Sequence, residues 1–152
     1  MESFKPDLMN EGRTSAARPV MLPDAPALVA GVRMVAWLNA DGEIETLDKA
    51  EASRRLHPSK PPIICHSRSF FSRLGAKPFL VYDVLELYAF VRPAQFTLPT
   101  PRGVAEVLGL ALPVNHDQEA ASLMNSAHAL ISELAATEKD SDSLAIAWAM
   151  HR

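Results

Sequence analysis

The chain has 152 residues and a single cysteine, Cys65, so it can form neither an internal disulfide nor a cysteine-based zinc site. It also lacks any apolar run near the ~20 residues that a membrane helix needs. Its first residues lack the apolar stretch of a signal peptide. These absences favour a soluble, cytoplasmic protein in a reducing compartment that does not contact a membrane.

Positive charge is not in excess either. The chain has 15 Lys and Arg against 18 Asp and Glu, a net charge of −3, which gives no field for wrapping nucleic acid. No G-x-x-x-x-G-K or G-x-G-x-x-G loop is present, and the five histidines are scattered without ligand spacing. We therefore expect no metal, nucleotide or other cofactor in this chain.

Two short apolar runs, at residues 63–65 and 79–82, each follow a proline and precede a segment with helical character. A strand–helix–strand–helix order indicates an α/β core with neighbouring strands parallel. Because neither run alternates with polar residues, both predicted strands should be buried on two faces. On strand 63–65, Cys65 and His66 would point to opposite faces, so we interpret Cys65 as a small core residue rather than a nucleophile.

The N-terminal part predicts an antiparallel hairpin. Residues 1–26 lack periodicity and indicate a flexible arm. Residues 27–38 form the first predicted strand, residues 39–42 supply turn chemistry, and residues 43–47 alternate as a half-exposed strand does.

A short helix should follow the hairpin. Asp48 is a candidate N-cap, with Glu51 three residues later, and the apolar side carries Ala50, Ala52 and Leu56. The outer face carries basic residues that are either solvated or contact phosphate; these are Lys49, Arg54 and Arg55.

Two further helices belong to the central stretch. Gly75 should end a helix over residues 67–74. Asp83 should cap a helix that runs through Phe90. Its expected buried side comprises Val84, Leu87, Tyr88 and Val91.

The C-terminal part predicts two more helices. Thr100 and the following proline start a short helix over residues 102–108, which stops at Gly109. A long helix should cover residues 118–137. Its predicted buried stripe comprises Ala121, Met124, Ala127, His128, Ile131, Leu134 and Ala135.

We therefore predict one folded domain over residues 27–138. Residues 139–152 should form a linker and the start of a truncated helix, because the apolar stretch 144–150 runs to the end of the chain without a cap.

Three stretches in order resemble DnaQ-like 3′–5′ exonucleases, which have an RNase H-like fold. Residues 64–71 (ICHSRSFF) resemble the family's V-A-H-N-A-x-F-D segment, and residues 82–87 (YDVLEL) are similar to its x-D-T-L-x-L segment. Residues 97–110 resemble its S-x-x-L-x-x-L-A-x-x-L-G-I helix pair, and His116 falls where the family places its catalytic histidine. The resemblance extends from about residue 27 to residue 136 and implies a truncated RNase H-like domain.

The carboxylates of that family are missing. Its reaction needs four carboxylates to hold two Mg²⁺ ions. Residues 29–38 contain no acid in place of the family's D-x-E, Phe71 stands at the position of its second aspartate, and Glu119 is a loose substitute for its last. We therefore expect no catalytic residue and no metal ligand. The degenerate exonuclease positions are His66, Phe71, Asp83, His116 and Glu119.

The amino-acid sequence of residues 27–103, together with the AIAWAM segment near the C-terminus, resembles one group of proteins more closely than it resembles the exonucleases. This group is the N-terminal region of alphaproteobacterial DinG-type ATP-dependent DNA helicases. In those proteins an exonuclease-like module without catalytic acids precedes the helicase. The resemblance implies a noncatalytic accessory module that positions or regulates the motor, with ATP and Mg²⁺ bound only in a downstream helicase domain. Two alternatives are a self-standing interaction protein with a degenerate RNase H-like core and a divergent metal-dependent nuclease.

Weak contact with single-stranded DNA is a further hypothesis. The groove should lie at the carboxyl ends of the parallel strands, near residues 66–68 and Asp83. Arg68 and Arg102 are the candidate phosphate contacts, and Phe70 or Phe71 would stack on a base. The alternative is that both phenylalanines are core residues and both arginines are merely solvated.

Overall fold

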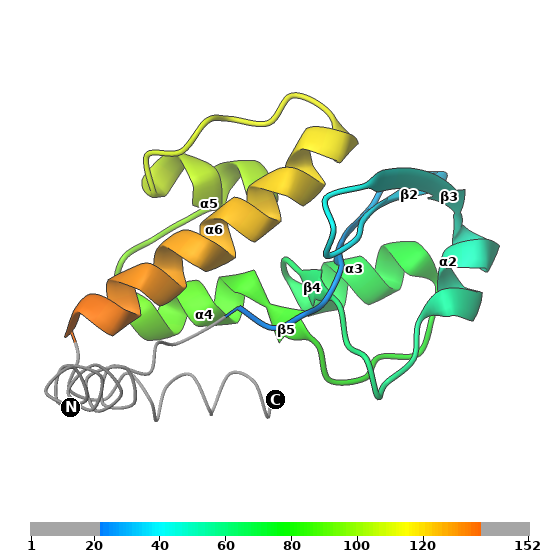
Figure 1. The fold of residues 1–152 in the computed structure, drawn as a ribbon, viewed down its shortest axis with the longest axis horizontal. Coiled ribbons are helices and arrows are strands. Elements are labelled where there is room, and N and C mark those ends of the chain that lie inside the picture. Colours follow the sequence, from blue (N-terminus) through cyan, green and yellow to red (C-terminus); the bar gives the residue numbers. More distant parts are fainter. Residues whose placement is uncertain (1–21, 138–152) are drawn as a thin grey trace, which may run out of the picture.

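The computed structural model describes residues 22–137 and contains a five-stranded mixed sheet in the order β3-β2-β1-β4-β5 (Figure 1). β1 pairs antiparallel with β2, and β2 pairs antiparallel with β3. On its other side β1 pairs parallel with β4, which in turn pairs parallel with β5. The strands are β1 (Ala27–Ala30), β2 (Met34–Leu38), β3 (Ile44–Asp48), β4 (Ile63–Ile64) and β5 (Tyr82–Asp83).

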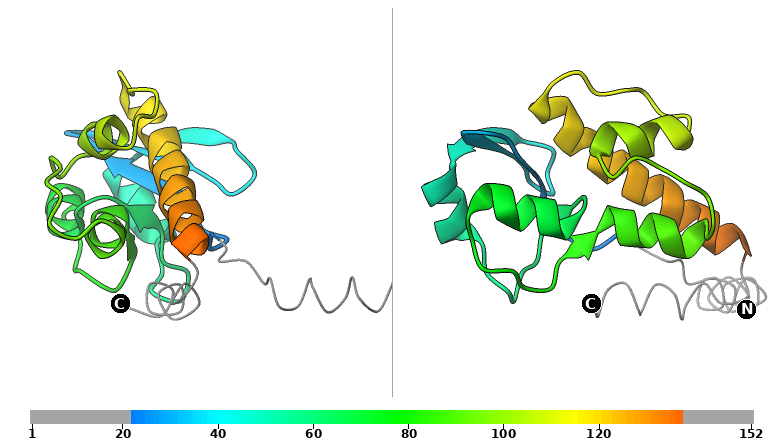
Figure 2. Two further views of the ribbon diagram at one scale, coloured as in Figure 1. Left: turned by 90° about the vertical axis from the view of Figure 1, so that its left-hand side faces the viewer. Right: turned by 180° about the vertical axis from the view of Figure 1, so that it is seen from behind.

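Helices cover both faces of the sheet, so the predicted α/β class is confirmed. α4, α5 and α6 form one layer, in which α6 packs on β1 and β2, while α2 and α3 lie against the opposite face (Figures 1 and 2). The helices are α2 (Lys49–Arg55), α3 (Ser67–Leu74), α4 (Val84–Val91), α5 (Pro101–Val107) and α6 (His116–Thr137).

β1 is the central strand and is buried along its whole length. Ala27 and Val29 face the α6 layer, whereas Leu28 and Ala30 face the α3 layer. β4 is likewise buried on both faces. Of the two apolar runs predicted to be strands buried on both faces, the one at residues 63–65 is confirmed by β4.

The single strand predicted over residues 27–38 is wrong. The chain reverses at Gly31–Arg33, where the Gly31 N–H donates to the Met34 carbonyl over 2.8 Å, and two strands result. Apolar residues on both sides of the reversal hide it in the sequence, because both strands contribute to the core. The hairpin across residues 39–42 is confirmed as the second half of a three-stranded meander.

The strand predicted over residues 79–82 is also displaced. β5 comprises only Tyr82–Asp83, and Pro78 and the residues after it run irregularly. Phe79 and Val81 nevertheless pack against the α3-side core. Leu80 is 66% exposed, so the predicted burial of this run on two faces is wrong, and the apolar character of Phe79 and Val81 reflects packing of their side chains rather than strand pairing.

The predicted helix signals hold where a polar side chain or a glycine defines the end. Asp48 accepts from the Glu51 N–H, Asp83 from the Leu85 N–H, and Thr100 from the Gly103 N–H. Gly75 ends α3 with φ +77° and Gly109 follows α5 with φ +73°, a backbone region that glycine enters without steric cost. α6 begins two residues earlier than predicted, at His116.

Burial along the helices departs from the predicted stripes at a few positions. His128 and Ala135 are exposed on α6, and Ala50 is exposed on α2. The buried face of α6 is centred elsewhere because this helix packs on the sheet and on two helices at once. That face comprises Ala120, Ser122, Leu123, Ser126, Ala127, Leu130, Ile131 and Leu134.

The packed chain starts earlier than residue 27. Ala25 is buried and Leu22 packs against the same core, so residues 22–26 belong to the folded part rather than to an arm. Residues 1–21 and the linker and helix predicted over 139–152 lie outside the described residues. Within residues 22–137, no helix combines the length and the hydropathy that crossing a membrane requires.

Candidate functional site

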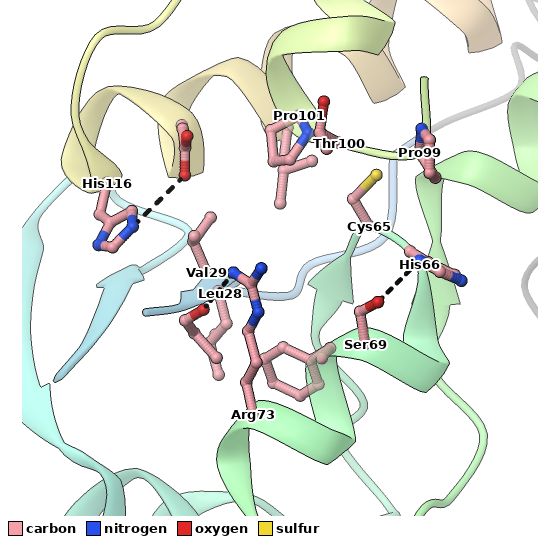
Figure 3. Close-up of a pocket in the computed structure, with 14 residues that line it drawn as sticks. Leu28, Val29, Cys65, His66, Ser69, Arg73, Pro99, Thr100, Pro101 and His116 are labelled. Atoms are coloured by element: carbon pink, nitrogen blue, oxygen red, sulfur yellow. Dashed lines mark hydrogen bonds and ion pairs between the residues drawn. The ribbon is translucent and has the colours of Figure 1, made fainter. Parts of the chain in front are cut away.

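A cavity of about 380 Å³ opens at the carboxyl ends of the parallel strands β1 and β4. Ligands commonly bind at this end of such strands. α3 and α6 contribute walls from the two opposite layers, and the segment before α5 forms a further wall (Figure 3). The lining residues are Leu28, Val29, Ala30, Cys65, His66, Ser69, Phe70, Arg73, Pro99, Thr100, Pro101, His116, Glu119 and Leu123.

Arg73 is the only Lys or Arg among the lining residues. Its Nη1 donates to the Ala30 carbonyl at the end of β1 over 3.4 Å, which is long for a hydrogen bond. Within residues 22–137 no carboxylate forms an ion pair with this guanidinium. In Figure 3 the guanidinium points into the space between His116 and His66, so its charge faces the cavity.

His66 and Ser69 lie at one side of the cavity and contact each other. The Ser69 Oγ is 2.9 Å from the His66 Nδ1. His66 has φ +64°, which is uncommon for a residue other than glycine and costs about 1–3 kcal/mol. This backbone conformation lets the chain leave β4 and enter α3 within two residues, which sets His66, Ser69 and Arg73 along one side of α3 at helical spacing.

Asp83 holds this turn in place from the end of β5. Its carboxylate accepts the His66 and Ser67 N–H groups, each over 2.8 Å, and also the Leu85 N–H over 2.9 Å. Asp83 is 4% exposed and does not line the cavity. Asp83 therefore joins the starts of α3 and α4. The sequence predicted its role as the N-cap of α4 but not its contacts with the start of α3.

His116 and Glu119 form the opposite side, on the first turn of α6. The His116 Nε2 lies 3.9 Å from the Glu119 Oε1. The His116 ring rests on Gly31, where an added Cβ would lie 2.3 Å from the His116 Cε1. Glycine at this position thus lets the ring lie across the end of β1.

Cys65 is partly buried rather than a full core residue, and its thiol lines the cavity. Burial raises the pKa of the Cys65 thiol, and the nearby Asp83 and Glu119 carboxylates raise it further. Since the thiolate is the nucleophile, this environment keeps Cys65 unreactive.

The predicted site residues divide into two groups. His66, His116 and Glu119 meet at the cavity, whereas Asp83 supports it from behind. Phe71 is 3% exposed and packs edge-to-face on Phe70 and Phe79, so it is a core residue.

The two candidate DNA contacts do not line the cavity. Arg68 is exposed on α3, and the Arg102 Nη1 donates to the Pro113 carbonyl over 2.9 Å. Phe70 lines the cavity but is 4% exposed, which leaves little ring area for stacking on a base.

Sequence reasoning missed Arg73, Ser69 and Thr100. The spacing of His66, Ser69 and Arg73 along one helix could have found the first two. Thr100 was recognised only as a helix cap, and its approach to the cavity depends on how α5 packs against α6.

Among the residues that the structure describes, no group of three or more His, Cys, Asp or Glu side chains could hold a metal ion. Comparisons with protein-family models, with curated proteins and with solved structures find no significant match to this chain.

Proposed function

We propose that this chain is a noncatalytic, exonuclease-like accessory module of a DNA helicase, acting in the cytoplasm, and that its cavity holds single-stranded DNA. The observation that carries the DNA contact is the guanidinium of Arg73. It faces a cavity of about 380 Å³ with no carboxylate partner among residues 22–137. A phosphate is the natural ligand of such a group, because a guanidinium forms charge-assisted hydrogen bonds with phosphate oxygens.

The sheet supports the fold part of the proposal. A three-stranded antiparallel meander followed by two strands parallel to its first strand, in the order β3-β2-β1-β4-β5, is expected of an RNase H-like domain. In this arrangement the substrate groove lies at the end of β1 and β4, where the cavity is found.

The residues at the two missing acid positions support a noncatalytic role. β1 contributes Leu28, Val29 and Ala30 to the cavity, and none of these can bind a metal ion. Phe71 is packed in the α3-side core and is remote from solvent. ATP hydrolysis and Mg²⁺ binding would then belong to a downstream helicase domain, the partner that this module positions or regulates.

The DNA contact is tested by fluorescence anisotropy with a labelled oligothymidylate of about ten nucleotides. We expect weak binding that falls by at least about 4-fold between about 20 and 150 mM salt, because each neutralised phosphate releases counterions and contributes about −0.7 to the slope of log K against log salt concentration. Arg73→Ala should weaken binding by about 10-fold or more, the effect of losing one charge-assisted hydrogen bond.

Arg54→Ala is the matched control. Arg54 is an exposed arginine that pairs with Glu51 and does not line the cavity, so its loss should leave binding within about 2-fold of wild type. The double variant Arg68→Ala with Arg102→Ala should likewise have little effect. Equal losses in all three variants would mean that general charge, rather than the cavity, attracts DNA.

The helicase context is tested separately, by reading the gene beyond codon 152. A G-x-x-x-x-G-K-[ST] segment in the same frame is expected, because this loop cradles the phosphates of ATP. A stop codon directly after codon 152 would instead favour a self-standing interaction protein.

A further inference from the structure

A second cavity of about 280 Å³ adjoins the first, and His116 lines both. The second cavity lies on the α6 side of the sheet, over β2 and β3, where α6 begins. Its lining residues are Met34, Ala36, Thr46, Asn115, His116 and Asp117.

The two cavities differ in charge. The first is lined by the Arg73 guanidinium and by the Glu119 carboxylate, which lies beside His116, whereas the second is lined by one carboxylate, Asp117, and by no lysine or arginine. An anionic phosphate fits the first cavity and would be repelled from the second. The polar side chains of the second cavity are Thr46, Asn115, His116 and Asp117, and their hydroxyl, amide, imidazole and carboxylate groups are of the kinds that hydrogen-bond to base edges.

The floor of the second cavity suits the flat face of a base. Ala36 and Thr46 are direct partners across the β2–β3 pair, and Met34 projects from the same face of β2. A methionine thioether and a small alanine methyl give an apolar surface, and sulfur contacts with aromatic rings are favourable. Met34 is 40% exposed and Ala36 is 3% exposed, so the accessible part of this surface is the Met34 side chain.

His116 connects the two cavities. Its side chain is 51% exposed, and its ring is held against Gly31, whose lack of a Cβ makes this position available. A single DNA strand that passes from one cavity to the other must cross the His116 ring. The ring provides a surface on which a base or a sugar can rest.

We propose that the second cavity holds a nucleobase of the same single strand whose phosphate Arg73 contacts, so that the site recognises a nucleotide rather than phosphate charge alone. This inference rests on the proposed function. It names the part of the ligand that each cavity takes, and it identifies His116 as the residue at which the strand passes from one cavity to the other.

The test compares two probes of equal charge, an oligothymidylate of about ten nucleotides and the same sugar–phosphate chain without bases. Wild-type protein should bind the oligothymidylate at least about 5-fold more tightly. Thr46→Met, which fills the second cavity from an exposed strand position, should reduce this preference to less than about 2-fold without changing the affinity for the abasic chain.

Ile44→Met is the matched control, because Ile44 lies two residues away on the same face of β3 and does not line the cavity. It should retain the wild-type preference. Met34→Ala removes the accessible apolar part of the floor and is a second, independent variant that should weaken binding of the oligothymidylate alone.

The outcomes separate the two proposals. If wild type binds both probes and Thr46→Met and Met34→Ala retain the wild-type preference, the second cavity takes no base and the inference is wrong, while the proposed function stands. If these variants weaken both probes equally, the effect is not on base binding and the inference is again wrong. If wild type binds neither probe, the DNA contact and this inference fail together.

Discussion

The surface of α2 and the cavity hold positive charge in different ways. On α2, Arg54 pairs with Glu51, and Arg55 pairs with both Glu51 and Glu45 while lying 5.6 Å from the centre of the Trp37 ring. In the cavity, the Arg73 guanidinium donates only to the Ala30 carbonyl among the described residues.

The basic face of α2 was expected either to be solvated or to contact phosphate, and these ion pairs favour the first interpretation. Its arginines are neutralised by neighbouring carboxylates and are held by the protein itself, so a solvated structural face explains them better than a phosphate contact. The charge at Arg73 is not neutralised in this way. A count of arginines in the sequence cannot make this distinction.

The largest expected effect comes from the carboxylate that supports the cavity. Asp83→Ala leaves three N–H groups without the acceptor that they have in the folded chain, at the starts of α3 and α4. We expect a loss of about 3 kcal/mol or more in the free energy of unfolding, which lowers Tm by roughly 10 °C.

The control for this prediction is Asp48→Ala. Asp48 caps α2 through one N–H group from an exposed position, so its loss should cost about 1 kcal/mol. Thermal unfolding followed by circular dichroism measures both variants. Equal shifts in Tm would contradict the joining role of Asp83.

The second prediction concerns the environment of Cys65. Because burial raises the pKa of this thiol, less thiolate is present at pH 8 than its ordinary pKa of 9.0 would give. We expect a thiol–disulfide reagent to react at least about 30-fold more slowly with the folded chain than with the chain in concentrated urea. The chain has one cysteine, so the absorbance change reports this site alone. Equal rates would place Cys65 in open solvent.

The third prediction gives Arg73 a carboxylate partner, as the arginines of α2 have. Ser69→Glu places a carboxylate four residues before Arg73 on α3, the spacing at which such pairs form on helices. DNA binding should fall at least about 10-fold, because the guanidinium is neutralised and a negative charge faces the phosphate.

Ser72→Glu is the control for this change. Ser72 lies on the same helix, is exposed, and does not line the cavity, so the variant carries the same net charge. It should retain most of the wild-type affinity. Similar losses from both variants would show that net charge alone governs binding.

How much of the fold the sequence could predict depends on how far apart in the sequence the interacting residues are. Asp48, Asp83 and Thr100 could be recognised as caps because each acts on a backbone group two or three residues away. The reversal at Gly31 could not be recognised in the same way. The reason for a glycine there is the His116 ring, which belongs to a helix distant in the sequence.

The same limit applies to the site. The location of the cavity at the ends of β1 and β4 follows from the strand order, and His66 and His116 could be expected there. The sequence could not show that Arg73 rather than Arg68 lines the cavity. Which arginine lines it depends on the side of α3 that faces β1, and the packing between the layers determines that side.

The smallest expected effect is on the α2 surface. Arg54→Ala should change Tm at neutral pH by no more than about 2 °C, since exposed ion pairs contribute little. Arg54, and then Arg55, lower the pKa of Glu51 below its ordinary value of 4.5. A lowered carboxylate pKa gives stabilisation that is present above the ordinary value and lost as the pH falls through the lowered one. The difference from wild type should therefore disappear in strongly acidic buffer, and a large difference that persists there would contradict this account.

The most direct test of the central claim is the salt dependence of DNA binding by wild type and by Arg73→Ala. Each phosphate that a cation neutralises on a single strand contributes about −0.7 to the slope of log K against log salt concentration. If Arg73 contacts a phosphate, the slope for Arg73→Ala should be shallower than that of wild type by about 0.7, and the slope for Arg54→Ala should be unchanged. Parallel lines for wild type and Arg73→Ala would contradict the claim that the cavity binds the strand through this arginine.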